Sequence, residues 1–338
     1  MKTANRTILR DQLPLKMPYL IQVFPCYACN FKCQYCIHAL PRENHGYISD
    51  CTLLDIKLFK DMVDDISASG ETVKMLRFAG IGEPLLHPQI AEMVAYASEK
   101  KIAKTIDIVT NGALLSPKLS EQLIKAGLST LRISIEGLSS EEYRKTTGAD
   151  VDFAAIVENI RFYYEHCGDS RIYVKIIDYM LQGSSEREKF FHEMFDSISH
   201  TVAIEHLTPT IQEIDYNEFC GDVDFTLTQD GEVKQNIRVC PQAFYMLQLN
   251  PDGTFVPCCS MKYPMVVRPN TTKISHVWNT SELTDFRLAL LKGKLNETCK
   301  ECTLYQYGTY PEDVLDGHED DLIRRFEGIA MKSGKSNS

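Results

Sequence analysis

The sequence predicts an α/β protein with a parallel sheet and a second, smaller domain. Between residues 19 and 206, short β-type runs alternate with amphipathic helical stretches, as in strands joined by crossover helices. A polar connector follows, and after it comes a hairpin pattern. The twelve cysteines fall mainly into one group near the start and one near the end. Two metal sites on two sequence segments would explain this distribution.

Short apolar runs and helical stretches alternate along the first two thirds of the chain. The predicted strands are 20–24, 73–78, 105–110, 130–135, 172–179 and 202–207. The predicted helices are 53–67, 89–101, 117–126, 153–166 and 186–197. Such units form either an open doubly wound sheet or part of a β/α barrel, and in both the chemistry belongs at the carboxyl ends of the strands.

After residue 206 the alternation of strand and helix patterns ends. Residues 244–249 and 254–257 flank an Asn-Pro-Asp-Gly turn and predict a hairpin. From Gly317 the chain is highly charged, which predicts a frayed helix and a disordered tail. We therefore divide the chain into an N-terminal extension (1–18), an α/β domain (19–206), a connector (207–239), a small α+β domain (240–310) and a C-terminal tail (311–338).

Composition narrows the location and the partners. The formal net charge of −10 argues against a broad nucleic-acid or anionic-membrane surface, because both attract clustered Lys and Arg. The sequence shows neither a secretory signal nor an apolar run of about 18 residues, so we expect a cytoplasmic protein. Structural disulfides are rare there, and metal binding is the leading explanation for the cysteines.

The first cysteine group directly follows the first predicted strand. Cys29, Cys33 and Cys36 have the spacing C-x3-C-x2-C. Three thiolates on a short loop suit a [4Fe-4S] cluster that keeps one iron free of protein ligands. Structural zinc is the alternative, with Cys26 or His38 as a fourth ligand. Otherwise Cys26 is expected to be a buried thiol without a catalytic role.

Polar groups follow three further predicted strands. Gly80 and Gly82 expose backbone carbonyls beside Glu83, a combination that suits an ammonium group, although a Gly-rich turn is also common in purely structural loops. Asn111 ends the third strand, and the alternative to a binding role is that its side chain simply caps a turn. Ser134 and Glu136 lie on the fourth strand and its end, on the same side of the predicted sheet.

The second cysteine group surrounds the predicted hairpin. Cys240, Cys258, Cys299 and Cys302 supply four thiolates, which fit either a [4Fe-4S] cluster or structural zinc. Cys259 competes with Cys258 as a ligand. We prefer Cys258 and expect Cys259 to be buried and inert.

The first triplet, with aromatic Tyr35 before its last cysteine, resembles the signature of the radical S-adenosylmethionine (radical SAM) superfamily. The resemblance implies that the free iron binds SAM and that reductive cleavage yields a 5′-deoxyadenosyl radical that removes a hydrogen atom from the substrate. Residues 80–84 resemble the Gly-Gly-Glu-Pro motif that holds the SAM amino group, with Ile81 in place of a glycine. Tyr35, Asn111, Ser134 and Glu136 are then further SAM-binding positions, Glu136 replacing the commoner Asp.

The C-terminal segment resembles the auxiliary-cluster domain called SPASM in its full form and Twitch in its shorter one. The resemblance rests on Asp252-Gly253, Pro257-Cys258, Trp278-Asn279 and the final C-x2-C pair. Cysteines are absent after Cys302, so one auxiliary [4Fe-4S] cluster and the Twitch form are expected. Together the two resemblances imply a partial (β/α)6 TIM-like barrel followed by a small α+β domain.

Three functions follow as hypotheses, and no catalytic residue is assigned. The first is hydrogen abstraction from a small polar metabolite such as a sugar, an aminocyclitol or a nucleotide-linked intermediate, including dehydrogenation with the auxiliary cluster as electron acceptor. The second is maturation or epimerisation of a ribosomal peptide, for which Cys51, Cys167, Cys220 or Cys259 would return a hydrogen atom. The third is a non-catalytic metal-binding scaffold. The family resemblance also implies an external electron donor such as flavodoxin or ferredoxin.

Overall fold

One curved sheet organises the molecule. The computed structural model describes residues 6–45, 52–260, 262–268 and 273–334. Eight strands lie in the order β6-β5-β4-β3-β2-β1-β7-β8. All neighbours pair in parallel except β7 and β8, which form an antiparallel hairpin. The strands are β1 (Leu20–Val23), β2 (Val73–Phe78), β3 (Ala103–Thr110), β4 (Thr130–Ile135), β5 (Arg171–Ile177), β6 (Thr201–Glu205), β7 (Met246–Leu249) and β8 (Phe255–Val256).

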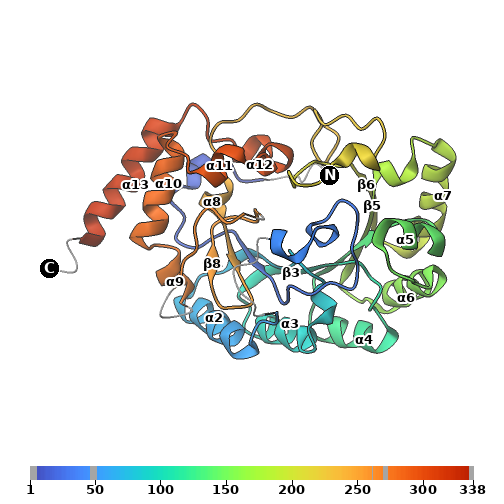
Figure 1. The fold of residues 1–338 in the computed structure, drawn as a ribbon. Coiled ribbons are helices and arrows are strands. Elements are labelled where there is room, and N and C mark those ends of the chain that lie inside the picture. The colour runs from blue at the N-terminus through green and yellow to red at the C-terminus, as the bar shows by residue number, and fades with distance from the viewer. Residues whose placement is uncertain (1–5, 46–51, 261, 269–272, 335–338) are drawn as a thin grey trace.

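Helices cover the outer face of this sheet, so that strands and helices form a partial barrel (Figure 1). The mixed α/β fold with a parallel barrel-like sheet is the predicted fold class, which is thereby confirmed. The hairpin β7–β8 extends the same sheet beyond β1. The helices of the barrel are α2 (Ile56–Ser69), α3 (Ile90–Glu99), α4 (Pro117–Lys125), α5 (Ser140–Thr147), α6 (Phe153–His166) and α7 (Ser185–Phe195).

Polar side chains fix where these helices begin. Ser116 accepts a hydrogen bond from the Leu119 amide at the start of α4, and Asp152 accepts one from Ala155 at the start of α6. Such N-caps satisfy amides that have no partner inside the helix. α2 begins at Ile56, later than predicted, because Asp55 caps it by accepting from the Lys57 amide.

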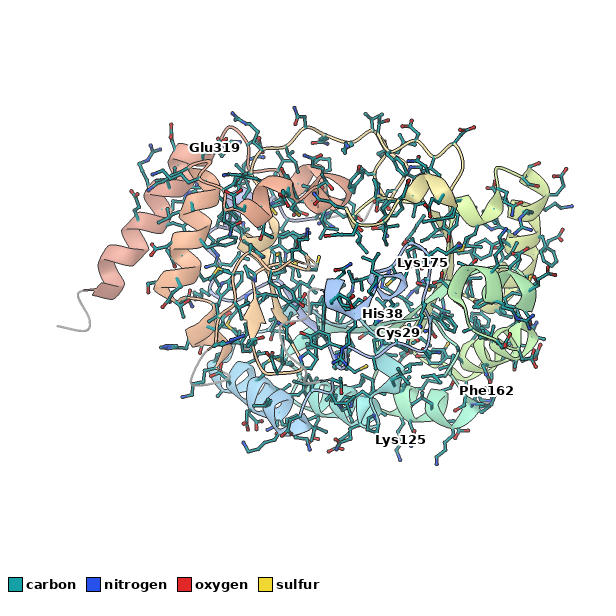
Figure 2. All side chains as sticks on the ribbon, viewed as in Figure 1. Cys29, His38, Lys125, Phe162, Lys175 and Glu319 are labelled. Atoms are coloured by element: carbon teal, nitrogen blue, oxygen red, sulfur yellow. The ribbon has the colours of Figure 1, made fainter. Side chains whose placement is uncertain are left out.

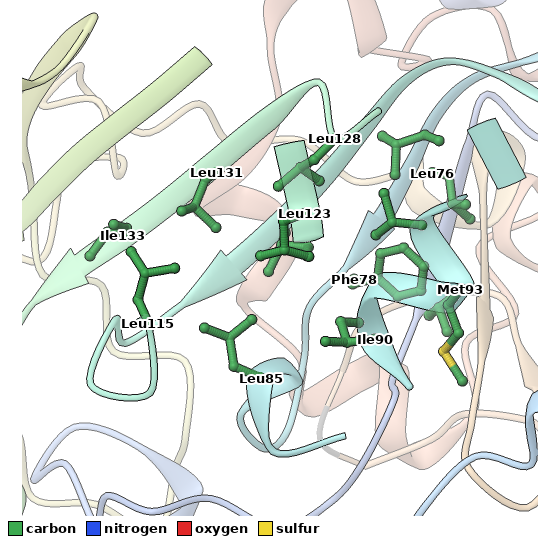
Figure 3. Close-up of a cluster of buried hydrophobic side chains, with 14 of the residues drawn as sticks. Leu76, Phe78, Leu85, Ile90, Met93, Leu115, Leu123, Leu128, Leu131 and Ile133 are labelled. Atoms are coloured by element: carbon green, nitrogen blue, oxygen red, sulfur yellow. The ribbon is translucent and has the colours of Figure 1, made fainter. Parts of the chain in front are cut away.

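The core lies between the sheet and the helices. Alternate residues of β4 point outward and are buried, as are Leu76 and Phe78 of β2, while Arg77 and the inward-facing residues of β4 are partly exposed. Figure 3 shows part of this core, formed by Leu76, Phe78, Leu85, Ile90, Met93, Leu115, Leu123, Leu128, Leu131 and Ile133. The outer face thus holds the fold together, and the inner face is left for polar groups.

The C-terminal part closes the ring on the side opposite α3 and α4 (Figure 1). Its last helix is not the frayed end expected from the charged sequence, because Leu322 and Phe326 of α13 pack with Leu290 and Leu291 of α10. Residues 335–338 of the predicted tail lie outside the described residues. The remaining α-helices are α1 (Leu9–Gln12), α8 (Gln242–Tyr245), α9 (Ile274–Val277), α10 (Ser281–Leu291), α11 (Glu297–Glu301), α12 (Leu304–Gly308) and α13 (Glu319–Gly334).

Short 3-10 turns complete the structure: η1 (Ile37–Ala39), η2 (Arg42–Asn44), η3 (Pro84–Leu86), η4 (Asp178–Leu181), η5 (Asp196–Ile198), η6 (Tyr216–Glu218) and η7 (Pro311–Asp313). Within the described ranges, none of the helices combines the length and apolarity needed to cross a membrane.

Candidate functional site

The loop that carries Cys29, Cys33 and Cys36 runs from β1 to η1 inside the ring, where Figure 2 labels Cys29. Two backbone hydrogen bonds anchor it to the end of α5: the Lys32 amide donates to the Thr147 carbonyl at 2.8 Å, and the Gln34 amide donates to the Thr146 carbonyl at 3.0 Å. Helix α5 therefore holds the loop with Cys29, Cys33 and Cys36 in place.

Of the three thiols of this loop, Cys33 is buried and Cys29 and Cys36 are half-buried. Burial raises the pKa of Cys29 to about 12 and also raises the pKa values of Cys33 and Cys36. The charge of a Cys36 thiolate would further raise the pKa values of Cys29 and Cys33, and that of a Cys29 thiolate would raise the pKa of Cys33. Thiolates become stable in such a place when a cationic metal centre binds them. The donor set fits a [4Fe-4S] cluster with one iron left open.

A tight turn after β2 requires both of its glycines. Gly82 has φ +108°, and a Cβ there would lie 2.3 Å from the Cys26 carbonyl oxygen. Gly80 has φ +127°, and a Cβ there would lie 1.8 Å from the Phe24 ring. Ile81, the departure from the family pattern, is buried in a small apolar cluster with Phe24. Backbone freedom and close approach thus explain the two glycines.

Glu83 lies at the centre of this end of the sheet, buried and multiply hydrogen-bonded. Its Oε1 accepts from the Leu85 amide at 2.9 Å and from the Thr110 hydroxyl at 2.6 Å, and its Oε2 accepts from the Asn111 amide at 2.8 Å. Burial raises the pKa of Glu83, and these donors oppose the rise. A carboxylate has about four acceptor positions, so one remains for an ammonium group. The residues present fit the amino group of SAM.

Asn111 links two strand ends to the cysteine loop. Its Nδ2 donates to Asn30 Oδ1 at 2.8 Å, and its Oδ1 accepts from the Ala113 amide at 3.0 Å. The second bond is the turn cap considered from the sequence. The first bond shows that Asn111 also holds residue 30 of the cysteine loop.

Glu136, which is buried, pairs with half-buried Tyr35 of the cysteine loop. The Tyr35 hydroxyl donates to the Glu136 carboxylate, with oxygen distances of 2.7 and 2.8 Å. Burial raises the pKa of Glu136 to about 7, while hydrogen bonding to Tyr35 and the charge of Lys175 lower it. Ser134 is half-buried on β4 and lies opposite Lys175 of β5. The predicted positions 35, 83, 111 and 136 thus surround one end of the sheet.

The second cysteine group gathers around a cavity of about 520 Å³. Four thiols line it together with Tyr305, namely those of Cys240, Cys258, Cys299 and Cys302. Cys259 lines a neighbouring cavity of about 540 Å³, which it shares with Cys302. Because Cys302 lines both cavities, the choice of Cys258 over Cys259 as the ligand stays a prediction. Among the described residues, no three His, Cys, Asp or Glu side chains are placed to hold a single metal ion.

The remaining thiols and tyrosines are distributed as follows. Cys26 is buried, as expected, and its Sγ donates to the Glu83 carbonyl at 3.1 Å. Cys167 and Cys220 are also buried, whereas Cys259 is half-buried rather than fully enclosed. Cys51 lies outside the described residues. Of the aromatic residues after Cys302, Tyr307 is buried against the connector and Tyr310 packs on Arg6.

Sequence reasoning missed a group of charged residues on the inner face of the sheet. Arg77, Asp107 and Arg132 come from β2, β3 and β4, and Lys175 and Glu205 come from β5 and β6. Figure 2 shows Lys175 inside the ring, whereas Lys125, Phe162 and Glu319 lie on the outer helices. The sequence signal that could have revealed them is a charged residue at alternate positions of an otherwise apolar strand, because alternate residues share one face of a sheet.

Comparison with known proteins agrees with this geometry. Residues 23–193, about half of the chain, match the model of the radical SAM superfamily, and residues 240–303 match an iron-sulfur cluster-binding domain, SPASM. The sequence is 31% identical over 147 residues to dTDP-4-amino-4,6-dideoxy-D-glucose ammonia-lyase of Streptomyces venezuelae, an alignment that covers 43% of this chain and 28% of that protein.

Two further curated relatives have similar matches. A GTP 3′,8-cyclase of Chlorobaculum tepidum is 31% identical over 150 residues, covering 44% of this chain and 42% of that protein. An S-adenosylmethionine-dependent nucleotide dehydratase of Selenomonas ruminantium is 32% identical over 124 residues, covering 36% and 41%. The chain thus aligns with less than half the length of these three relatives.

Solved structures share the fold at low sequence identity. BtrN in complex with AdoMet and 2-DOIA has a TM-score of 0.51 at 17% identity, covering 85% of this chain and 93% of that one. SuiB of Streptococcus suis bound to the precursor peptide SuiA has a TM-score of 0.60 at 16% identity, covering 88% and 72%. The family match and the geometry together show that the chain belongs to the radical SAM superfamily and carries a SPASM-type iron-sulfur domain in its C-terminal part.

Proposed function

We propose that this radical SAM enzyme abstracts a hydrogen atom from a small polar metabolite, namely a sugar, an aminocyclitol or a nucleotide-linked intermediate, in the cytoplasm. The observation that carries the proposal is the polar inner face next to the SAM residues, where Arg77, Arg132 and Lys175 are partly exposed. Apolar side chains would be expected in a chamber built for an apolar substrate. By their names, one of the three curated relatives acts on a dTDP-linked amino sugar and the other two act on nucleotides.

The roles of the chain's residues follow from their positions. Cys29, Cys33 and Cys36 hold the SAM-binding [4Fe-4S] cluster, and Glu83 accepts the SAM ammonium at its free acceptor position. Gly80 and Gly82 bring backbone to the same place, and Tyr35, Asn111, Ser134 and Glu136 complete the SAM site.

Cys240, Cys258, Cys299 and Cys302 hold one auxiliary [4Fe-4S] cluster, as in a Twitch domain. When bound, the SAM-binding cluster would pass one electron to SAM, whose cleavage would give the 5′-deoxyadenosyl radical, and the auxiliary cluster would accept the electron released by a dehydrogenated substrate. The first electron comes from an external donor such as flavodoxin or ferredoxin. The substrate's hydrogen atom ends in 5′-deoxyadenosine, and dehydrogenation of an alcohol also releases a proton to water on the inner face.

Anaerobic reconstitution followed by a SAM cleavage assay tests the enzyme assignment. With two loaded clusters and a reductant, the protein should form 5′-deoxyadenosine, and failure to do so would favour a metal-binding scaffold. Deuterated nucleotide sugars, aminocyclitols and peptides would then be offered in turn. Deuterium transfer into 5′-deoxyadenosine from a metabolite supports the proposal, and transfer from a peptide alone contradicts it.

A further inference from the structure

Three charged side chains from adjacent strands meet on the inner face of the sheet. Arg77 of β2 lies in register with Asp107 of β3, and Arg132 of β4 lies opposite Val109, two residues beyond Asp107. Both arginines contact the same carboxylate oxygen: Asp107 Oδ2 lies 3.4 Å from Arg77 Nη2 and 3.0 Å from Arg132 Nε. We call Arg77, Asp107 and Arg132 the inner-face triad.

The triad carries an excess of positive charge. A guanidinium group stays charged at any ordinary pH, so two cations share one carboxylate. Lys175, the next cation on this face, already pairs with Glu205. Buried or half-buried charge that is not balanced is unfavourable, and an anion would balance it.

Most donors of the two guanidinium groups have no partner. Among the described residues, the Arg132 side chain donates through Nε alone, which leaves the N–H groups on Nη1 and Nη2. Arg77 donates only from Nη2, and its buried Nε has no acceptor in the same part of the chain. Asp107 is fully buried, and its Oδ2 is the acceptor that the two guanidinium groups share.

The arginines are held in place but can be reached by a ligand. The Arg132 guanidinium lies 4.9 Å from the centre of the Tyr173 ring, which fixes its plane. The side chains of Arg77 and Arg132 are 27% and 29% exposed, although the outward-facing residues between them are fully buried.

We propose that the inner-face triad binds a phosphoryl group of the substrate, with Arg77 and Arg132 as donors and Asp107 as the residue that positions them. This inference rests on the proposed function, because it names the class of metabolite that the same chamber takes. Two guanidinium groups present paired N–H donors that match phosphate oxygens.

Titration calorimetry on the full chain, reconstituted anaerobically and loaded with SAM, tests the proposal with inorganic phosphate as the probe and acetate as a second anion. Arg77→Gln and Arg132→Gln should each weaken phosphate binding at least about tenfold, and Arg77→Lys should retain part of it. Arg161→Gln is the matched control, because Arg161 lies on α6 with 41% of its side chain exposed, paired to Glu158. That control should bind as the wild type does.

Two results would overturn the inference: unchanged phosphate affinity in both glutamine variants, or acetate bound as tightly as phosphate by the wild type. Iron content and circular dichroism verify that each variant is folded, and Arg77→Lys serves if Arg77→Gln does not fold. Assaying 5′-deoxyadenosine in the same samples separates the two proposals. Phosphate binding without SAM cleavage contradicts the enzyme assignment, whereas SAM cleavage without phosphate binding contradicts only the phosphoryl site.

Discussion

The Tyr35 hydroxyl donates to the carboxylate of Glu136, at 2.7 and 2.8 Å from its two oxygens, and so ties the cysteine loop to the end of β4. Tyr35 lies between Cys33 and Cys36, and Glu136 lies about 100 residues away. The bond is therefore a long-range contact between the cysteine loop and the sheet. Glu136 is buried and Tyr35 is half-buried, and a hydrogen bond to a charged group is strong where water is largely excluded.

Tyr35→Phe should therefore destabilise the protein. The substitution leaves a buried carboxyl group without its donor, a loss of about 1–3 kcal/mol. Thermal unfolding of the reconstituted protein measures it. Tyr96→Phe is the control, because the Tyr96 hydroxyl donates to Asp64 on the exposed surface, and it should change stability little. Equal melting temperatures for the two variants would contradict the structural role of the Tyr35–Glu136 bond.

Glu83→Gln should impair SAM binding while the clusters still assemble. The amide group would place N–H donors against the Thr110 hydroxyl or the Leu85 and Asn111 amides, and it lacks the charge that attracts an ammonium group. We expect SAM affinity to fall about tenfold or more, measured by equilibrium binding. Glu92→Gln on the surface of α3, paired with Lys60, is the control and should bind SAM normally. Unchanged SAM affinity in Glu83→Gln would refute this role.

Gly82→Ala should disrupt the turn beneath the SAM site. Its Cβ would lie 2.3 Å from the Cys26 carbonyl oxygen at a φ of +108°, so the backbone must move. Strain of this kind costs about 1–3 kcal/mol or more. Gly148→Ala offers a matched control, since Gly148 also has positive φ (+68°) but nothing within 4 Å of the added Cβ. The two variants are compared by iron content and thermal unfolding, and similar losses in both would show that φ alone matters.

Cys258→Ala and Cys259→Ala should differ in the number of clusters they hold. Cys258 lines the cavity of the other three C-terminal thiols, and Cys259 lines the neighbouring one. The first variant should drop from about eight to about four irons per chain, as expected from two [4Fe-4S] clusters, and the second should keep about eight. Iron analysis and electron paramagnetic resonance of the reduced proteins measure this. The reverse pattern would make Cys259 the ligand.

His38 predicts a pH dependence of stability. Burial, followed by the nearby charge of His45, lowers the pKa of His38 from 6.5 to about 4. Between pH 6.5 and pH 4, His38 is protonated in the unfolded chain and neutral in the folded chain. The free energy of unfolding therefore falls as the pH drops from 6.5 towards 4. Relative to His38→Asn, the wild type should therefore lose unfolding free energy over that window, measured by urea unfolding at each pH. Parallel pH profiles for the two proteins would disprove it.

Much of the secondary structure could be predicted because it depends on local pattern. The strands predicted at 73–78 and 130–135 and the helix at 153–166 have those bounds in β2, β4 and α6. α5 was missed, because its sequence is mostly polar and only Tyr143, Thr146 and Thr147 are buried. Its contacts with the cysteine loop are long-range, and hydrophobic periodicity does not report them.

The sequence by itself determined the family and the iron-sulfur character of the two cysteine groups, because metal ligation depends on residue type and close spacing. Only the tertiary structure decided which thiols line a common cavity, that Tyr35 pairs with Glu136, and that Arg77 and Arg132 share Asp107. Those relationships join residues far apart in the chain. They arise from strand register and from the curvature that brings inner-face side chains together, which no local pattern encodes.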